Sequence, residues 1–275
     1  MRLKTVPARQ GSLWVRQGFR AFFKRPMAFA ALFAAFMFVV FVLALVPLAG
    51  TLVLLTLLPL VSLGFMIATR TVVGGGLPTP LAFIEPLRAS AARVRSMIWL
   101  GVIYAAATFA VMWLSELADG GAFEALMDAL PAAQTAPDTV AAKRAAPGLL
   151  WGLLLRFGLA GLLSVPFWHA PALVHWDGQR CAQALFSSTL ACWRNRGAFL
   201  VYSMTWFSLI IGIGIGIVAS LLFAAIGSPQ LFAVAGAPIS LFITTVFYTS
   251  LYFTFADCFE ADAPKPDPDP VPAVA

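Results

Sequence analysis

The chain has 275 residues, of which 61% are hydrophobic and only 11% are charged, and its formal net charge is +6. Soluble domains carry a charge on about a quarter of their residues, so this composition excludes an ordinary soluble protein. The apolar residues occur in runs long enough to cross a bilayer, which takes about 20 residues in a helix. A membrane protein is therefore expected.

Six apolar runs predict membrane-spanning helices. They cover residues 27–46, 49–69, 96–115, 149–172, 199–225 and 230–256. The predicted fold class is all-α: a polytopic transmembrane helix bundle with six spans and short amphipathic cytoplasmic helices. We expect one membrane domain over residues 1–262, followed by a disordered cytoplasmic tail at 263–275, where proline alternates with charge.

The basic residues predict the orientation. Fifteen of the 18 Lys and Arg residues fall before the first span, between spans two and three, between spans four and five, or after span six. Basic loops are retained on the cytoplasmic side of a membrane, so both termini are expected in the cytoplasm. The loop at 116–148 is then external, with a short helix expected at 122–130.

The N-terminus does not fit a cleavable signal peptide. The basic region before the first apolar run is some 26 residues long. That run is also longer than a signal-peptide core of about 7–15 residues. The first span is therefore expected to remain attached as an anchor.

The segment 8–25, ahead of the first span, has an amphipathic pattern. Its basic face carries Arg9, Arg16, Arg20 and Lys24, and its apolar face carries Val15, Phe19 and Phe22. This pattern is typical of a helix lying flat among lipid headgroups, with its cations near anionic lipid. The alternative is a basic flank without a role of its own, and the two interpretations are compatible. No nucleic-acid partner is expected.

Two segments of the chain resemble each other. FKRPMAF at residues 23–29 aligns with WRNRGAF at residues 193–199, each directly before an apolar hairpin. The match is short. It suits the repeated units of transporters and a bundle that transports nothing equally well, so it does not decide the function.

Several strings carry a family resemblance. VPARQG at residues 6–11, SLGFM at 62–66, PALV at 171–174 and CWRN at 192–195 resemble an uncharacterised family of multi-spanning inner-membrane proteins of Gram-negative bacteria. The resemblance extends from residue 4 to about residue 260. It implies a bacterial inner-membrane location and supplies no activity and no functional residues.

Arg156 is the one unambiguous charge within a predicted span. Buried membrane charges are costly and often functional, although a residue near a helix end can reach the headgroups. Its expected partners are acceptors on neighbouring helices or Glu116. Pro59 and Pro238 interrupt spans two and six, and together with Arg156 they are the candidate substrate-binding residues; simple helix kinks are the alternative.

The remaining reactive side chains give no pattern for a cofactor or a metal. His169 and His175 are six residues apart and do not share a helix face, so they are interpreted as interfacial histidines beside Trp168 and Trp176. The three cysteines lack paired zinc-ligand spacing and are expected to be free thiols. We expect no cofactor and no metal.

Small residues recur every four positions in span five. They are Ser208, Gly212, Gly216, Ser220 and Ala224. Such a stripe lets another helix backbone approach closely. It predicts helix packing, either within the monomer or in a homo-oligomer.

No function class is specified by a motif. The predicted spans contain no Asp or Glu, which disfavours cation-coupled transport. Familiar catalytic motifs are missing too, so the chain is not expected to be an enzyme. The leading hypothesis is a non-enzymatic scaffold, envelope or complex component with a protein partner. The alternative is a facilitator or carrier for an anionic or amphiphilic solute.

Overall fold

The structure is a computed structural model of residues 1–275. It describes the backbone of residues 1–129, 148–223 and 229–260, and within these ranges all side chains except those of 214–223 and 229–237. The predicted tail at 263–275 and the link between spans five and six at 224–228 therefore lie outside the described residues.

The described chain is almost entirely helical. In order, the elements are β1 (Arg2–Leu3), α1 (Gln10–Lys24), α2 (Pro26–Ala44), α3 (Ala49–Val73), η1 (Pro80–Phe83), η2 (Glu85–Arg88), α4 (Ala91–Asp119), α5 (Ala122–Ala129), α7 (Leu149–Phe167), α8 (Ala170–Asp177), α9 (Cys181–Arg194), α10 (Arg196–Phe223), α11 (Pro229–Cys258) and β2 (Phe259–Glu260). Six helical segments are long and apolar enough to cross a membrane: α2, α3, α4, α7 continued by α8, α10 and α11. The all-α, six-span prediction is confirmed.

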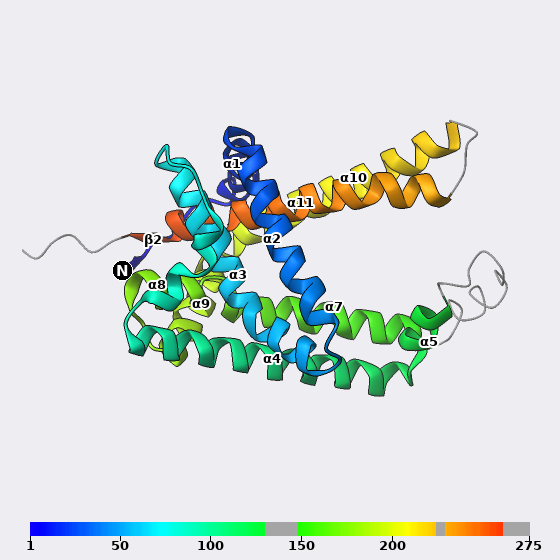
Figure 1. The fold of residues 1–275 in the computed structure, drawn as a ribbon, viewed down its shortest axis with the longest axis horizontal. Coiled ribbons are helices and arrows are strands. Elements are labelled where there is room, and N and C mark those ends of the chain that lie inside the picture. Colours follow the sequence, from blue (N-terminus) through cyan, green and yellow to red (C-terminus); the bar gives the residue numbers. More distant parts are fainter. Residues whose placement is uncertain (130–147, 224–228, 261–275) are drawn as a thin grey trace, which may run out of the picture.

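The spans form three antiparallel hairpins. Helices α4 and α7 lie side by side, α10 and α11 form a second pair that diverges from them, and α2 and α3 cross both pairs obliquely (Figure 1). The helices α1, α8 and α9 gather at the opposite end from α5. The short link between α2, which ends at Ala44, and α3, which begins at Ala49, forces these two helices to be antiparallel neighbours.

A strap formed by residues 1–9 ties the N-terminus to the end of the last span. Arg2 pairs with Glu260 in the antiparallel β1–β2 ladder, and the Lys4 N–H donates to the Cys258 carbonyl at 2.8 Å. The terminal ammonium of Met1 lies 2.9 Å from Asp177. The start and end of the described chain therefore lie at the same end of the helix bundle. Six membrane crossings, an even number, require this arrangement.

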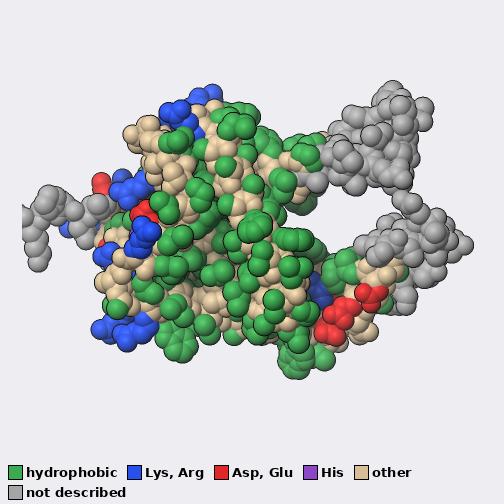
Figure 2. All heavy atoms as spheres, viewed as in Figure 1, with side chains coloured by type: hydrophobic (Ala, Val, Ile, Leu, Met, Phe, Trp, Pro, Cys, Tyr) green, Lys and Arg blue, Asp and Glu red, His purple; other side chains and the backbone are tan. Residues whose placement is uncertain are grey.

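Charge is unevenly distributed over the molecule. Lys and Arg side chains gather over the end that holds the N-terminus, while Asp and Glu side chains cluster at the far end near α5 (Figure 2). The surface between the two ends is largely hydrophobic in this view. This is the distribution expected when an apolar belt lies in the bilayer and basic residues remain on one side.

Helix α1 is amphipathic, but protein covers its apolar face. Trp14, Val15 and Phe22 are buried against α10 and α11. The basic residues of the opposite face, Arg9, Arg16, Arg20 and Lys24, are exposed. The apolar face of α1 therefore packs on protein and belongs to the core, while the position of its cations near anionic lipid stays a prediction.

Polar contacts and small residues fix the position of α1. Gln10 Nε2 and Trp14 Nε1 donate to the same Asp257 oxygen at 2.6 and 2.7 Å. A Cβ on Gly11 would overlap the carbonyl oxygen of Ala198 in α10. A Cβ on Gly18 would lie 2.7 Å from the side chain of Ser250 in α11. Both glycines thus permit backbone contact that any larger residue would prevent.

The two similar segments of the sequence form the same local structure. Helix α1 ends at Lys24 and α2 begins at Pro26, while α9 ends at Arg194 and α10 begins at Arg196. The single-residue breaks at Arg25 and Asn195 are equivalent positions in the alignment of residues 23–29 with 193–199. A short helix, a one-residue elbow and a long apolar helix therefore occur twice.

Replacing Gly18 by alanine is expected to destabilise the protein by about 1–3 kcal/mol, because the added methyl group overpacks the α1–α11 contact. This cost exceeds the gain of up to about 1 kcal/mol from the better helix propensity of alanine. The measurement is thermal unfolding of the purified protein in detergent.

The matched control is Gly212→Ala in α10, where no described atom lies within 4 Å of the added carbon. It is expected to be neutral or slightly stabilising. Equal effects of the two substitutions would contradict the close approach of α1.

Candidate functional site

Arg156 in α7 is paired at the end of the molecule opposite the strap. Its Nη2 lies 3.9 Å from Oδ2 of Asp119, the last residue of α4. Its Cζ lies 3.9 Å from the centroid of the Phe123 ring in α5. The Asp119 side chain is fully buried and that of Arg156 is only 17% exposed. Three helices thus meet around one neutralised cation.

The backbone around Asp119 is shaped to hold its carboxylate. A left-handed turn at Gly120 (φ +59°) and Gly121 (φ +80°) follows α4, and the Gly121 N–H donates to Asp119 Oδ1 at 2.8 Å. A Cβ on Gly152 in α7 would overlap the Asp119 side chain. Glycine is therefore required for α7 to pass this close to α4.

Of the partners expected for Arg156, the structure selects an acceptor on a neighbouring helix and not Glu116. Glu116 is exposed and lies about one turn before Asp119. The sequence placed Asp119 in the external loop because the predicted third span ended at residue 115. The helix α4 instead continues to Asp119, which places this carboxylate against α7.

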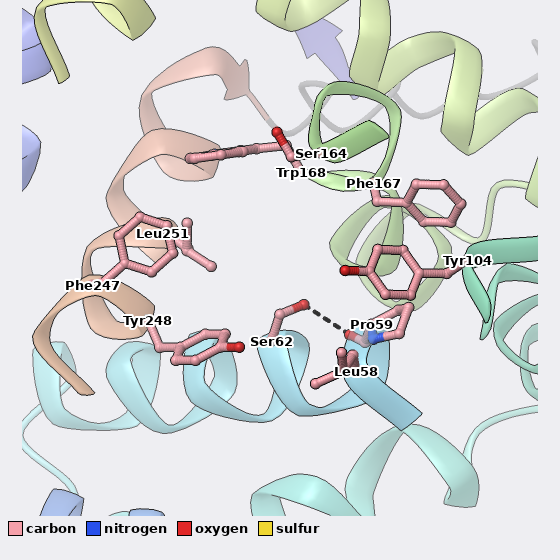
Figure 3. A pocket seen from close by; sticks show the side chains of 10 residues that line it. All are labelled: Leu58, Pro59, Ser62, Tyr104, Ser164, Phe167, Trp168, Phe247, Tyr248 and Leu251. Carbon is pink, nitrogen blue, oxygen red and sulfur yellow. Dashed lines mark hydrogen bonds between the residues drawn. The ribbon is translucent and has the colours of Figure 1, made fainter. Parts of the chain in front are cut away.

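A cavity of about 180 Å³ lies between α3, α4, α7 and α11. Pro59 is part of its wall, and the carbonyl of Pro59 accepts a hydrogen bond from Ser62 at 2.8 Å. The hydroxyl groups of Tyr104 and Tyr248 point into it from two sides (Figure 3). The lining residues are Leu58, Pro59, Ser62, Tyr104, Ser164, Phe167, Trp168, Phe247, Tyr248 and Leu251.

A buried hydrogen-bond network supports one wall of this cavity. Trp168 Nε1 donates to Thr254 Oγ1 at 3.2 Å, and that hydroxyl donates to the Leu251 carbonyl at 2.8 Å. His169 Nε2 lies 3.1 Å from the same hydroxyl oxygen. The Thr254 hydroxyl donates its hydrogen to the Leu251 carbonyl, so toward His169 it can only accept a hydrogen bond. The network therefore assigns the proton of neutral His169 to Nε2.

Both histidines contact protein groups. His169 is completely buried in the protein, and its interpretation as a histidine at the membrane interface stays a prediction. His175 Nε2 lies 3.4 Å from Glu85, and its side chain is 11% exposed. The part of the chain that the structure describes contains no group of three His, Cys, Asp or Glu residues arranged to hold a metal ion.

The three candidate substrate-binding residues do not share a site. Pro59 belongs to the central cavity, while Pro238 lines a separate apolar groove of about 620 Å³ between α2 and α11. Arg156 lines neither of these two cavities. The three residues are therefore not brought together in either cavity, and their role in substrate binding stays a prediction.

The small-residue stripe of span five is only partly described. Ser208 and Gly212 are exposed, and Gly212 has no described neighbour within packing distance. The side chains of Gly216, Ser220 and Ala224 lie outside the described residues. The packing role of the whole stripe therefore stays a prediction.

Sequence reasoning missed Asp119 and the two cavity tyrosines. A signal for the tyrosines was present, because all four tyrosines of the chain fall within predicted spans. Hydroxyl-bearing rings in apolar helices usually find a polar partner or a polar space. Their meeting across one cavity depends on the arrangement of α4 and α11, which the sequence does not reveal.

Comparison with known proteins identifies a relative by sequence, but no matching family model and no matching solved structure. A probable inner membrane protein of Burkholderia thailandensis is 35% identical over 269 residues, which is 96% of this chain and 97% of the relative. No family model matches the chain. No solved structure matches it either.

The Arg156–Asp119 pair yields a prediction for stability. Asp119→Leu and Arg156→Met each leave a charged group in a poorly hydrated position without its partner, so each is expected to cost about 1–3 kcal/mol. The double variant is expected to lose less than the sum of the two. Thermal unfolding of the four proteins in detergent measures this coupling.

The control is Glu116→Ala, on the same helix but exposed, which is expected to change stability little. Strictly additive single effects would show that the two side chains do not interact.

Proposed function

The chain belongs to the family of the Burkholderia thailandensis probable inner membrane protein, and on that premise we propose that it is a non-enzymatic structural component of the bacterial inner membrane. In this role it serves as a scaffold, an envelope component or a subunit of a larger complex. The relative's name gives a location and no activity. The proposal is therefore argued from the partners that the polar side chains of the membrane domain contact.

The pairing of Arg156 is the observation that carries the proposal. A carrier that used this cation to bind an anion would need it to line a path open to water. Instead Arg156 is held by Asp119 and Phe123 and joins α4, α5 and α7. A charge engaged in this way favours a packing role over a substrate-binding role.

The basic end of the molecule is the expected contact surface for partners. It carries the exposed residues Arg16 and Arg20 on α1 and Arg9 directly before it, and the strap keeps both ends of the described chain there. The excess of Lys and Arg at this end supports placing both termini in the cytoplasm. A cytoplasmic basic surface suits anionic lipid headgroups and acidic protein surfaces.

A carrier or facilitator for an anionic or amphiphilic solute is the second candidate. The observation that favours it is the central cavity, where the hydroxyl groups of Tyr104 and Tyr248 face a common space (Figure 3). Hydroxyl groups in an apolar site can orient a small polar ligand. The two candidates differ in whether water reaches this cavity.

Cysteine accessibility distinguishes the candidates without knowledge of a substrate. Ser62→Cys and Ser164→Cys each place a thiol in the cavity wall with little change in volume. For a structural component, a membrane-impermeant methanethiosulfonate reagent is expected to leave both thiols unlabelled from either side. Labelling of both positions in intact proteoliposomes would overturn the proposal and favour the carrier.

The background for this experiment is a Cys181→Ser protein, because Cys181 is partly exposed. Burial raises the pKa of the Cys192 thiol to about 12, so it stays protonated and unreactive at pH 8. Cys258 has no exposed surface. The positive control is Ser12→Cys on the exposed side of α1, which is expected to react readily.

A further inference from the structure

An apolar groove runs between α2 and α11. It has a volume of about 620 Å³, and α2 contributes one face of small and aromatic residues to it. The lining residues are Phe22, Ala30, Phe33, Ala34, Met37, Phe38, Pro238, Leu241, Phe242 and Thr245. The Thr245 hydroxyl already donates a hydrogen bond to the Leu241 carbonyl at 2.7 Å. The groove therefore offers hydrocarbon contacts and no free side-chain donor.

Two cations that pair with no described carboxylate lie at one end of this groove. Phe22 lines the groove from the last turn of α1, and Lys24 and Arg25 follow it directly at the α1–α2 elbow. Both are exposed, and neither makes an ion pair with a described carboxylate. Arg20 is exposed one turn earlier on the same helix. Figure 2 shows Lys and Arg side chains gathered over this part of the molecule.

The cations precede the first groove residue of α2, so they stand at the start of the groove. Ala30, the first residue of α2 in the groove wall, follows Arg25 by five residues, or about 7.5 Å along a helix. Ala34 and Phe38 continue the same face at intervals of four residues. An extended hydrocarbon chain lying along Ala30, Ala34 and Phe38 would thus have its polar head beside Lys24 and Arg25.

We propose that this is a binding site for one anionic phospholipid, with an acyl chain in the α2–α11 groove and its phosphate against Lys24 and Arg25. The apolar lining selects a hydrocarbon chain, and the unpaired cations select a negative headgroup. Basic pockets between membrane helices on the cytoplasmic side are known to hold such headgroups. The site goes beyond the proposed structural role and does not depend on it.

Two other occupants fit the observations less well. A soluble anion would use the cations but gains nothing from the apolar groove. A helix of a partner protein would bury the groove but leave Lys24 and Arg25 needing a separate acidic group. A phospholipid satisfies both features in one molecule, and the bilayer supplies it at high local concentration.

Lipid binding to the delipidated full-length protein in detergent tests the site. The probes are phosphatidylglycerol, phosphatidylcholine with the same acyl chains, and glycerol phosphate. Phosphatidylglycerol is expected to raise the unfolding midpoint at about tenfold lower concentration than phosphatidylcholine. Glycerol phosphate, which has no acyl chain, is expected to give no shift. Native mass spectrometry counts the retained lipid.

Two variants separate the headgroup contact from the acyl-chain contact. Lys24→Ala combined with Arg25→Ala is expected to reduce the apparent affinity for phosphatidylglycerol about tenfold, to the level of phosphatidylcholine. Ala34→Phe fills the groove and is expected to weaken both lipids. Should Ala34→Phe lower the folded yield, Ala30→Leu makes the same test with a smaller side chain.

Matched controls lie on the same helices outside the site. Arg9→Ala removes an exposed cation at the other end of α1, and Ala31→Phe adds a ring to an exposed position of α2 that does not line the groove. Both are expected to bind like the unmodified protein. Equal affinity for the two lipids, equal effects of Ala34→Phe and Ala31→Phe, or stabilisation by glycerol phosphate alone would each overturn the proposal.

Discussion

The docking of α1 onto α10 and α11 is the contact on which the rest of the structure depends. Asp257, at the end of the last span, accepts hydrogen bonds from Gln10 and Trp14, while Gly11 and Gly18 bring the helix backbones together. This contact joins the beginning of the chain to its last hairpin. It also positions the α1–α2 elbow, and thereby the direction in which the first span leaves the bundle. The apolar groove and the basic surface both follow from that direction.

The carboxylates that organise the bundle lie at helix ends. Asp119 ends α4, and Asp257 is the second-last residue of α11. A carboxylate in the middle of a span would carry a large desolvation penalty, whereas one at the end can be paired within the protein while its helix still crosses the apolar layer. Asp119 faces the Arg156 cation of α7, the other helix of its own hairpin, and Asp257 accepts two hydrogen bonds from α1. The spans are therefore joined at their two ends by polar contacts and along their length by close packing.

The sequence predicted the helices well and their contacts poorly, for one physical reason. Hydrophobic length identifies a span, but it does not specify which face of the helix meets which neighbour, because lipid is as apolar as leucine. The six spans and the short helix after α4 were predicted from the sequence. The predicted spans ended at residues 115 and 256, just short of Asp119 and Asp257, so Asp119 was assigned to the external loop and Asp257 was left outside the last span. Likewise the amphipathic segment before span one was recognised, but amphipathicity alone cannot distinguish a lipid surface from a protein surface.

The distribution of satisfied and unsatisfied polar groups bears on where the protein acts. Within the described membrane region, Arg156 is neutralised by Asp119, and His169 shares the Thr254 hydroxyl with Trp168. These contacts join helices of the bundle, while Arg156 Nε and His169 Nδ1 are buried and have no hydrogen-bond partner among the described residues. At the basic end, by contrast, Arg16, Arg20, Lys24 and Arg25 remain exposed without described carboxylate partners. Exposed cations on a rigid helix without described carboxylate partners retain their capacity to bind anionic groups, which is the physical basis of the lipid site proposed at the α1–α2 elbow.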